Sequence, residues 1–224
     1  MLSDVMEDYL KAIYVLQAEG DPPVSTSAIA AYLDKTPPTV TSMIGKLADR
    51  GLVDREKYKG VELTPEGETV ALEVIRHHRL LETFLTERLD YSWSEVHDEA
   101  DRLEHHISEE FERRVAETLD NPTVDPHGDP IPGADLEPLC EDDSVRLSEF
   151  AEGDHVVVSR VSDRNDEELA YLEDAGITPG TELAIVDIAP FGMVTVRTPD
   201  DGEQSLPESV ARSIRVEAVV EEAA

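Results

Sequence analysis

The chain has 224 residues, more than one typical domain needs, and 40% of them are hydrophobic. No segment approaches the ~20 consecutive apolar residues of a membrane span, and the acidic start "MLSDVMEDYL" is unlike a secretory signal. We therefore expect a cytoplasmic protein with no membrane partner. The single cysteine, Cys140, excludes an intramolecular disulfide and a metal site built from several thiolates.

The net charge of −32 argues against nucleic acid as a partner, but this charge is unevenly distributed. Residues 1–65 have a net charge of −3 and contain all five lysines, whereas the rest of the chain has a net charge of −29. The contrast indicates that the N-terminal segment approaches something anionic; an acidic protein with no such partner is the alternative. High acidity with scarce lysine also resembles the proteins of salt-loving archaea.

The first predicted elements form a winged helix. Apolar residues recur at helical spacing over 4–19, and "EGDPP" ends that helix. Ser25 or Thr26 can cap a short second helix, and Pro38 suits the first turn of a third helix that ends before Gly51. Residues 52–63 then alternate as a short hairpin. Helix–turn–helix followed by a hairpin predicts DNA binding, with protein assembly as the alternative use of such a unit.

In a winged helix the start of the third helix faces base edges in the major groove, and flanking basic groups hold phosphates. Short hydroxyl side chains let this helix lie deep in the groove, although a threonine-rich start can also serve only for capping. The expected DNA-contacting residues are Thr36, Pro38, Thr39, Thr41, Ser42, Lys46, Arg50, Arg55, Lys57 and Lys59.

Three further helices are predicted, from Thr64 to about Arg88, over 94–107 and over 108–119. A stretch rich in proline and glycine then closes the helical part. Strand-like segments follow at 155–161, 181–188, 193–198 and 213–220, with one helix over 166–175, and together they predict a small β-barrel. We expect four parts: residues 1–65, 66–138, a linker over 139–145, and 146–220.

The stretch "VHDEADRLEHHIS", residues 96–108, is the strongest signal for a site. On a helix His97, Asp101 and His105 are spaced by one turn, and Glu104 falls on the same stripe. The preceding predicted helix carries His78 and Glu82 at the same spacing. One such stripe is compatible with an exposed, ion-paired face, but two adjacent helices with imidazole–carboxylate pairs favour metal binding.

Five segments in this order, "MEDYLKAIY", the winged helix, "HHRLLETFL", "VHDEADRLEHHIS" and "GDPIPG", resemble the diphtheria toxin repressor family of metal-dependent transcriptional regulators. The resemblance covers the whole chain. It implies a winged-helix domain, a helical dimerisation domain and an SH3-like, FeoA-like barrel. It also implies a homodimer that binds a palindromic operator in double-stranded DNA when loaded with Fe(II) or Mn(II), and that controls metal uptake.

By this resemblance, Asp8 in "MEDYL" and Asp101, Glu104 and His105 are the primary metal ligands. His78, Glu82 and His97 match an ancillary site, to which the barrel would add Glu168.

Two departures from the family pattern bear on the metal. Iron-responsive members commonly have Met and Cys where Asp8 and Asp101 stand, and oxygen ligands without sulfur favour Mn(II), with Fe(II) as the alternative. Lys11 occupies the place of an acidic ligand of the two-domain manganese-type members, which favours two separate metal sites over a paired cluster.

Two other functions are compatible with parts of the sequence. Histidines and carboxylates on adjacent helices could belong to a zinc hydrolase, but the sequence has no general-base glutamate in an HExxH-like motif. A hydrolase would also leave the winged helix unexplained, so we expect no enzymatic activity. The second alternative is a winged-helix regulator that binds a small organic ligand, in which the histidine stripe would be only part of the surface. A metal-dependent regulator explains the stripe and needs no organic cofactor. His77, His127, His155 and Trp93 are expected to be structural.

Overall fold

The computed structural model describes residues 2–20, 22–56, 59–139, 144–190, 192–200 and 202–219. Lys57, Cys140 and the expected linker residues 141–143 lie outside this part of the chain. The chain divides into two compact units. The N-terminal unit comprises Met1–Leu81, Asp101–Thr123 and Ile131–Glu141, and the C-terminal unit comprises Glu82–Ala100, Val124–Pro130 and Asp142–Ala224.

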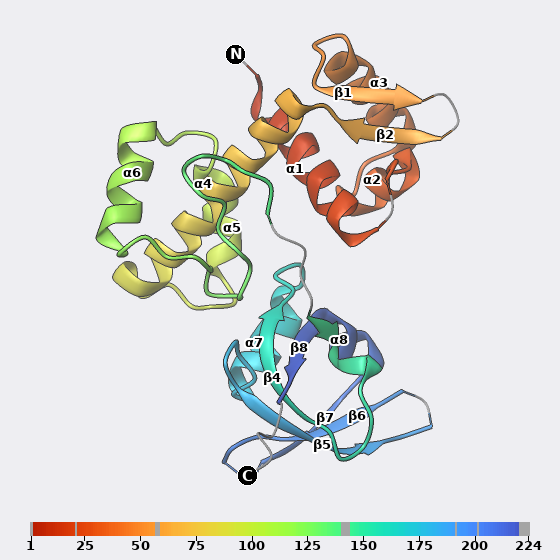
Figure 1. Cartoon of the computed structure of the whole chain (residues 1–224), viewed down its shortest axis with the longest axis vertical. Coiled ribbons are helices and arrows are strands. Elements are labelled where there is room, and N and C mark those ends of the chain that lie inside the picture. The colour runs from red at the N-terminus through yellow and green to blue at the C-terminus, as the bar shows by residue number, and fades with distance from the viewer. Residues whose placement is uncertain are drawn as a thin grey trace. The chain divides into compact units, whose positions relative to one another are not determined.

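The winged helix opens the N-terminal unit. Its elements are α1 (Asp4–Glu19), α2 (Thr26–Tyr32), α3 (Pro37–Ala48), β1 (Val53–Glu56) and β2 (Gly60–Leu63) (Figure 1). The Ser25 side chain accepts a hydrogen bond from the Ala28 amide and so caps α2, while proline occupies the first turn of α3. The antiparallel hairpin β1–β2 is extended by a bridge between Val24 and Val61.

Apolar faces of these helices meet in one core. Leu10 and Ile13 of α1, Ile29 of α2 and Ile44 and Leu47 of α3 are fully buried in it. Each such side chain contributes about 1.5–3 kcal/mol to the stability of the fold. This packing turns the opposite, polar face of α3 toward solvent.

Three helices follow: α4 (Pro65–Leu89), α5 (Val96–Leu103) and α6 (Glu109–Thr118). A Cβ at Gly67 would lie 1.9 Å from the Leu52 carbonyl oxygen, so only glycine lets α4 start against the hairpin. The predicted helix over 94–107 is wrong at its C-terminal end. The helix stops at Leu103, residues 104–106 form a turn, and Ser108 caps α6 through the Phe111 amide.

The elements of the C-terminal unit are β3 (Val145–Arg146), a 3-10 turn (Leu147–Glu149), β4 (His155–Val161), α7 (Asp166–Asp174), β5 (Glu182–Ile188), β6 (Val194–Arg197), β7 (Glu203–Leu206), α8 (Glu208–Ser213) and β8 (Ile214–Ala218). The strands form a six-stranded antiparallel sheet in the order β3-β8-β4-β5-β6-β7. Figure 1 labels β4 to β8 of this sheet. Register shifts within β4 and β5 mark bulges, which increase the local twist of a sheet.

The sequence prediction missed β7 and α8. Only Leu206 of β7 is buried, so this strand lacks the alternation of apolar and polar residues from which a strand is predicted. Trp93, which precedes α5, is buried in the same core as the sheet and donates its indole N–H to the Pro126 carbonyl at 2.8 Å. It is a packing residue, as the sequence indicated.

The loop over 124–130 lies against β4. Val161 donates its amide to the His127 carbonyl at 2.9 Å, and Arg160 pairs with Asp129 at 3.0 Å. A Cβ at Gly128 would lie 2.1 Å from the Ser159 carbonyl, and its φ of +88° is also one that favours glycine. The "GDPIPG" motif therefore begins with a residue that allows this close approach.

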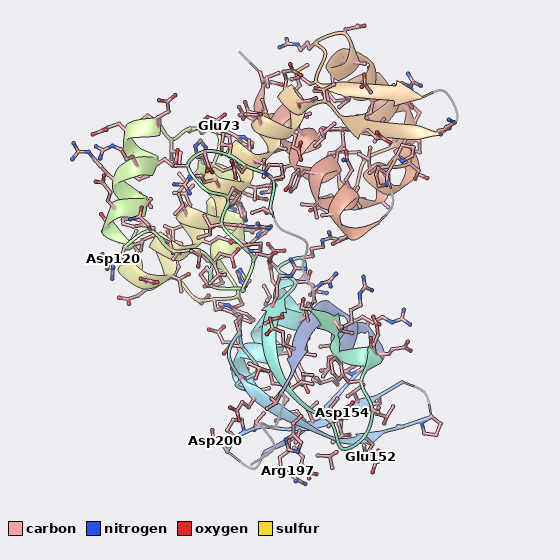
Figure 2. The ribbon with its side chains drawn as sticks, in the orientation of Figure 1. Glu73, Asp120, Glu152, Asp154, Arg197 and Asp200 are labelled. Carbon is pink, nitrogen blue, oxygen red and sulfur yellow. The ribbon has the colours of Figure 1, made fainter. Side chains whose placement is uncertain are left out.

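Acidic side chains extend from the surface of both units, as Glu73, Asp120, Glu152 and Asp200 illustrate (Figure 2). Among the described residues, no helix is both long enough and apolar enough to cross a membrane.

Candidate metal centre

Asp8, Glu104 and His105, which we call the primary group, offer ligand atoms that all lie within 4.8 Å of one another. Asp8 comes from the second turn of α1, and Glu104 and His105 come from the turn after α5. The His105 Nε2 atom lies 2.9 Å from an Asp8 carboxylate oxygen and 3.5 Å from a Glu104 oxygen. Two carboxylates and an imidazole form a donor set that suits Mn(II) or Fe(II).

The other ring nitrogen of His105 faces Glu7, with Nδ1 2.8 Å from a Glu7 carboxylate oxygen. The hydrogen bond to Asp8, opposed by burial and reinforced by Glu7, raises the pKa of His105 to about 9. In the protein without metal this ring is therefore an imidazolium that donates to both carboxylates. With a cation on the Nε2 side, Glu7 would keep the Nδ1–H and orient the ring.

Sequence reasoning missed Glu7. Its only local signal is its place immediately before Asp8 on a helix whose first half is acidic.

Asp101 is not part of the primary group. With His78 and Glu104 it surrounds the ammonium of Lys11, and we call these three residues the Lys11 group. The Lys11 Nζ atom lies 2.8 Å from Glu104 Oε2, 3.0 Å from Asp101 Oδ1 and 3.1 Å from His78 Nδ1. Glu104 therefore belongs to both groups, and the expected four-residue primary set is divided between them.

Glu104 is 1% exposed and keeps its negative charge. Burial opposes that charge, but the hydrogen bond from His78 at 2.5 Å and the nearby Lys11 ammonium lower the pKa of Glu104. Its two oxygens face different partners: Oε1 is the atom near His105, and Oε2 is the atom near Lys11 and His78.

The C-terminal unit holds a further candidate set, Glu82, His97 and Asp163, which we call the second group. The His97 Nδ1 atom lies 3.2 Å from a Glu82 oxygen and 3.3 Å from an Asp163 oxygen. Glu82 is fully buried, and His78 precedes it by one turn on α4. Because α5 ends at Leu103, His97 and His105 do not share one continuous helical stripe.

The sequence prediction named Glu168 as the residue from the barrel. The structure places Glu168 in the first turn of α7, where its side chain accepts from Asn165 and its amide donates to the Asn165 side chain. Asp163, which precedes that helix, is the residue that approaches His97. Nothing in the local sequence distinguishes Asp163 as a possible ligand from the other acidic residues between 163 and 168.

His127, expected to be structural, is also placed beside Glu82. It is fully buried, its Nε2 atom donates to the Trp93 carbonyl at 2.9 Å, and its Nδ1 atom lies 3.7 Å from a Glu82 oxygen. Burial disfavours its charge, but the Glu82 carboxylate outweighs this and raises the pKa of His127 to about 9. Glu82, Asp125 and His127 form a fourth set of possible ligand atoms within 4.8 Å.

Nine of the ten predicted DNA-contacting residues are exposed on the winged helix, and the tenth, Lys57, lies outside the described residues. Val40, Ile44 and Leu47 are buried on the inner face of α3, and Thr36 makes no side-chain capping bond to the backbone. The exposed predicted residues are Thr36, Pro38, Thr39, Thr41, Ser42, Lys46, Arg50, Arg55 and Lys59.

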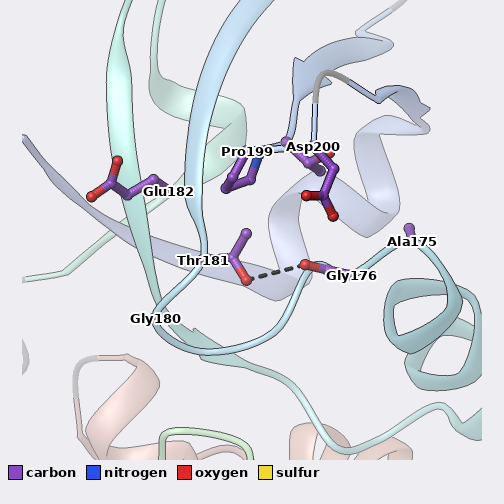
Figure 3. A pocket seen from close by; sticks show the side chains of 8 residues that line it. Ala175, Gly176, Gly180, Thr181, Glu182, Pro199 and Asp200 are labelled. Atoms are coloured by element: carbon purple, nitrogen blue, oxygen red, sulfur yellow. Dashed lines mark hydrogen bonds between the residues drawn. The ribbon is translucent and has the colours of Figure 1, made fainter.

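A cavity of about 450 Å³ lies in the C-terminal unit between the end of α7, the start of β5 and the turn after β6 (Figure 3). Thr181 donates its hydroxyl to the Gly176 carbonyl at its edge, and Glu182 and Asp200 are its acidic lining residues. None of the residues in the primary, Lys11 or second group lines it.

Comparisons with known proteins agree with this architecture. Residues 1–61 match the family model "Iron dependent repressor, N-terminal DNA binding domain", and residues 64–133 match "Iron dependent repressor, metal binding and dimerisation domain". Residues 145–218 match the model of the FeoA domain.

Two relatives are similar over almost their whole length. The iron-dependent repressor IdeR of Mycobacterium tuberculosis is 38% identical, with 97% of this chain and 99% of the relative covered. The diphtheria toxin repressor of Corynebacterium diphtheriae is 33% identical, with 96% and 98% covered. A solved structure of a manganese-dependent transcriptional repressor in complex with manganese is 37% identical, with a TM-score of 0.88 and 96% and 100% covered.

The fold and these likenesses define a metal-dependent, DNA-binding transcriptional repressor. The chain belongs to the iron-dependent repressor family that includes the diphtheria toxin repressor. The resemblance inferred from the sequence is thereby confirmed, as are the winged helix, the helical domain, the small antiparallel β domain and the assignment to regulators rather than enzymes.

Proposed function

We propose that the chain forms a homodimer that binds a palindromic operator when Mn(II) occupies the primary group. One observation carries this proposal. Asp8 lies on α1 of the winged helix, whereas Glu104 and His105 follow α5 in the helical part, and their ligand atoms converge within 4.8 Å. A cation held by all three residues would fasten the DNA-binding helices to the part of the chain that dimerises.

This fastening explains how metal can control DNA binding. Two recognition helices in a dimer must fit half-sites about one helical turn, ~34–36 Å, or a multiple of it apart. A cation bound by Asp8, Glu104 and a deprotonated His105 would replace the charge of the imidazolium with direct bonds between α1 and the turn after α5, and so would favour one separation of the two helices. Coupling of this kind is typically worth ~1–3 kcal/mol, which is a 5–150-fold change in operator affinity.

The choice of Mn(II) over Fe(II) rests on donor chemistry. The primary group and the adjoining Asp101 offer carboxylates and imidazole and no sulfur, and harder oxygen donors suit Mn(II). The relatives include proteins named for iron and for manganese at nearly equal identity. Fe(II) is therefore the alternative, and the genes under control would be those for uptake of the activating metal.

We propose that Glu82 and His97 hold a second ion, together with His78 from the same face of α4 and Asp163 from the β domain. The contacts of His97 with Glu82 and Asp163 support this set. Asp163 takes the place in the proposal that the sequence had given to Glu168. The fourth set, Asp125 and His127 with Glu82, shares a carboxylate with this site and offers it two more donors.

We assign DNA recognition to residues 1–65 and metal binding and dimerisation to residues 66–138. Residues 139–145 would be the linker to an SH3-like domain over 146–220. The proposed DNA-contacting residues are the nine exposed ones named above and Lys57, which lies outside the described residues.

Operator binding measured against metal identity tests the proposal. A duplex would be selected from a random-sequence pool with the Mn(II)-loaded protein, and its affinity measured with Mn(II), anaerobic Fe(II), Zn(II) or EDTA. We expect Mn(II) to activate at the lowest free concentration. Activation at lower free Fe(II) would overturn the choice of metal, and DNA affinity indifferent to every metal would overturn the function.

A further inference from the structure

Lys11 places a positive charge where the adjoining residues could otherwise hold a cation of their own. Its ammonium lies within 3.1 Å of one atom from each of His78, Asp101 and Glu104. The Lys11 side chain is 18% exposed, and those of His78 and Glu104 are 4% and 1% exposed. An imidazole and two carboxylates around a shielded point charge are the same chemical groups that form the primary group.

Glu104 connects the two positions. Its Oε1 atom lies near His105 in the primary group, and its Oε2 atom lies near the Lys11 ammonium. A carboxylate that presents its two oxygens to two neighbouring cations is the arrangement found in paired metal sites. Here one of the two cations is covalently part of the chain.

The charge at this position is permanent. The Lys11 ammonium is held by ion pairs to Glu104 at 2.8 Å and to Asp101 at 3.0 Å, and because it is covalently attached to the chain it does not dissociate as a bound metal ion can. A divalent ion at the same place would have to overcome the repulsion of this ammonium and displace it from two carboxylates.

We propose that Lys11 is a tethered cation that takes the place of a second divalent ion among His78, Asp101 and Glu104, and so limits the primary group to a single ion. This inference rests on the proposed metal centre. It assigns Lys11 the role of setting metal stoichiometry, and it explains why Asp101 turns to Lys11 rather than to His105.

Metal counting tests the role of Lys11. Lys11→Glu removes the ammonium and supplies a carboxylate, and we expect this variant to bind one more Mn(II) per chain than the wild type by equilibrium dialysis with elemental analysis. Because Glu104 would then bridge two ions, the electron paramagnetic resonance spectrum should gain an exchange-coupled manganese pair. Lys11→Arg keeps the charge, and its count should equal that of the wild type.

Two further variants make the test specific. Lys35→Glu changes the charge equally at an exposed lysine between α2 and α3 and should leave the count unchanged. Lys11→Gln removes the charge without adding a carboxylate, so this variant should bind the additional ion more weakly than Lys11→Glu does. Circular dichroism would show that each variant is folded, and Lys11→Gln carries the test if Lys11→Glu does not fold.

The inference fails if folded Lys11→Glu and Lys11→Gln both bind the wild-type number of ions, or if the wild type already shows a coupled pair. A different result would contradict the proposed metal centre itself: Asp8→Ala in the wild-type background would bind as many Mn(II) ions per chain as the wild type.

Discussion

The His105 Nε2 atom lies 2.9 Å from a carboxylate oxygen of Asp8, a residue 97 positions earlier in the chain. This contact joins the first helix of the winged helix to the turn after α5. Because His105 also contacts Glu7, the two ring nitrogens meet two carboxylates from α1. In the function proposed above, a metal bound at this contact would act on the DNA-binding part of the protein.

Removal of the Asp8 carboxylate should uncouple DNA binding from metal. We expect Asp8→Ala to abolish metal-dependent operator binding and to weaken Mn(II) binding at the primary group by about tenfold or more, while the dimer persists. Sedimentation and fluorescence anisotropy would measure the two properties. Asp4→Ala, an exposed carboxylate on the same helix, is the matched control. Loss of the dimer in Asp8→Ala would contradict this division of roles.

Mn(II) binding should release a proton from His105. Its pKa of about 9 in the metal-free protein means that the ring must be deprotonated before Nε2 can ligate. Affinity should therefore rise about tenfold per pH unit between about 6.5 and 9. Calorimetry in buffers of different ionisation enthalpy would count the released protons, with about one expected at pH 7.5. Glu7→Gln should weaken the dependence, and a pH-independent affinity would contradict the assignment.

The same group predicts how the stability of the metal-free protein varies with pH. The folded pKa of His105 is above the ordinary value of 6.5, so its ion pairs stabilise the fold fully below about pH 6.5. That contribution is lost as the pH rises through about 9. Urea unfolding of the wild type and His105→Gln in EDTA should show a difference that is larger at pH 6 than at pH 9.5. An equal difference at both values would show that His105 does not titrate in this range.

Substitution of Asp163 and of Glu168 should affect the affinity for the second ion differently. Asp163 contacts His97, whereas Glu168 contacts Asn165, so Asp163→Ala should weaken the second Mn(II) by about 10–100-fold and Glu168→Ala should leave it almost unchanged. Dialysis at several free Mn(II) concentrations would separate the two ions. The reverse order of effects would restore the sequence-based choice of Glu168.

Lys46 on α3 should contribute to affinity without contributing to sequence preference. Lys46→Ala should weaken binding to all duplexes similarly and reduce the slope of log K against log salt by about 0.9 for each chain of the dimer. Arg212 on α8 is exposed and paired with Glu208, and Arg212→Ala should leave that slope unchanged. An unchanged slope in Lys46→Ala would place Lys46 away from the phosphates.

Local signals in the sequence were sufficient for most of the fold. Apolar spacing and the cap at Ser25 located the winged helix, and Pro38 marked the first turn of α3. β7 was missed because it buries only Leu206, and the end of α5 was misplaced because "LEHHIS" keeps helical composition through a turn. Periodicity reports which residues are apolar, and it does not report where the backbone must turn to begin the next element.

By itself the sequence determined the order of most elements and the confinement of all five lysines to the first 60 residues. Its family resemblance also predicted which segments carry metal ligands. Only the tertiary structure decided which side chains meet. It divided Asp101 from His105, brought Asp163 rather than Glu168 to His97, and placed His127 beside Glu82. These contacts depend on where helices end and loops pack, and residues far apart in the chain carry no local trace of that geometry.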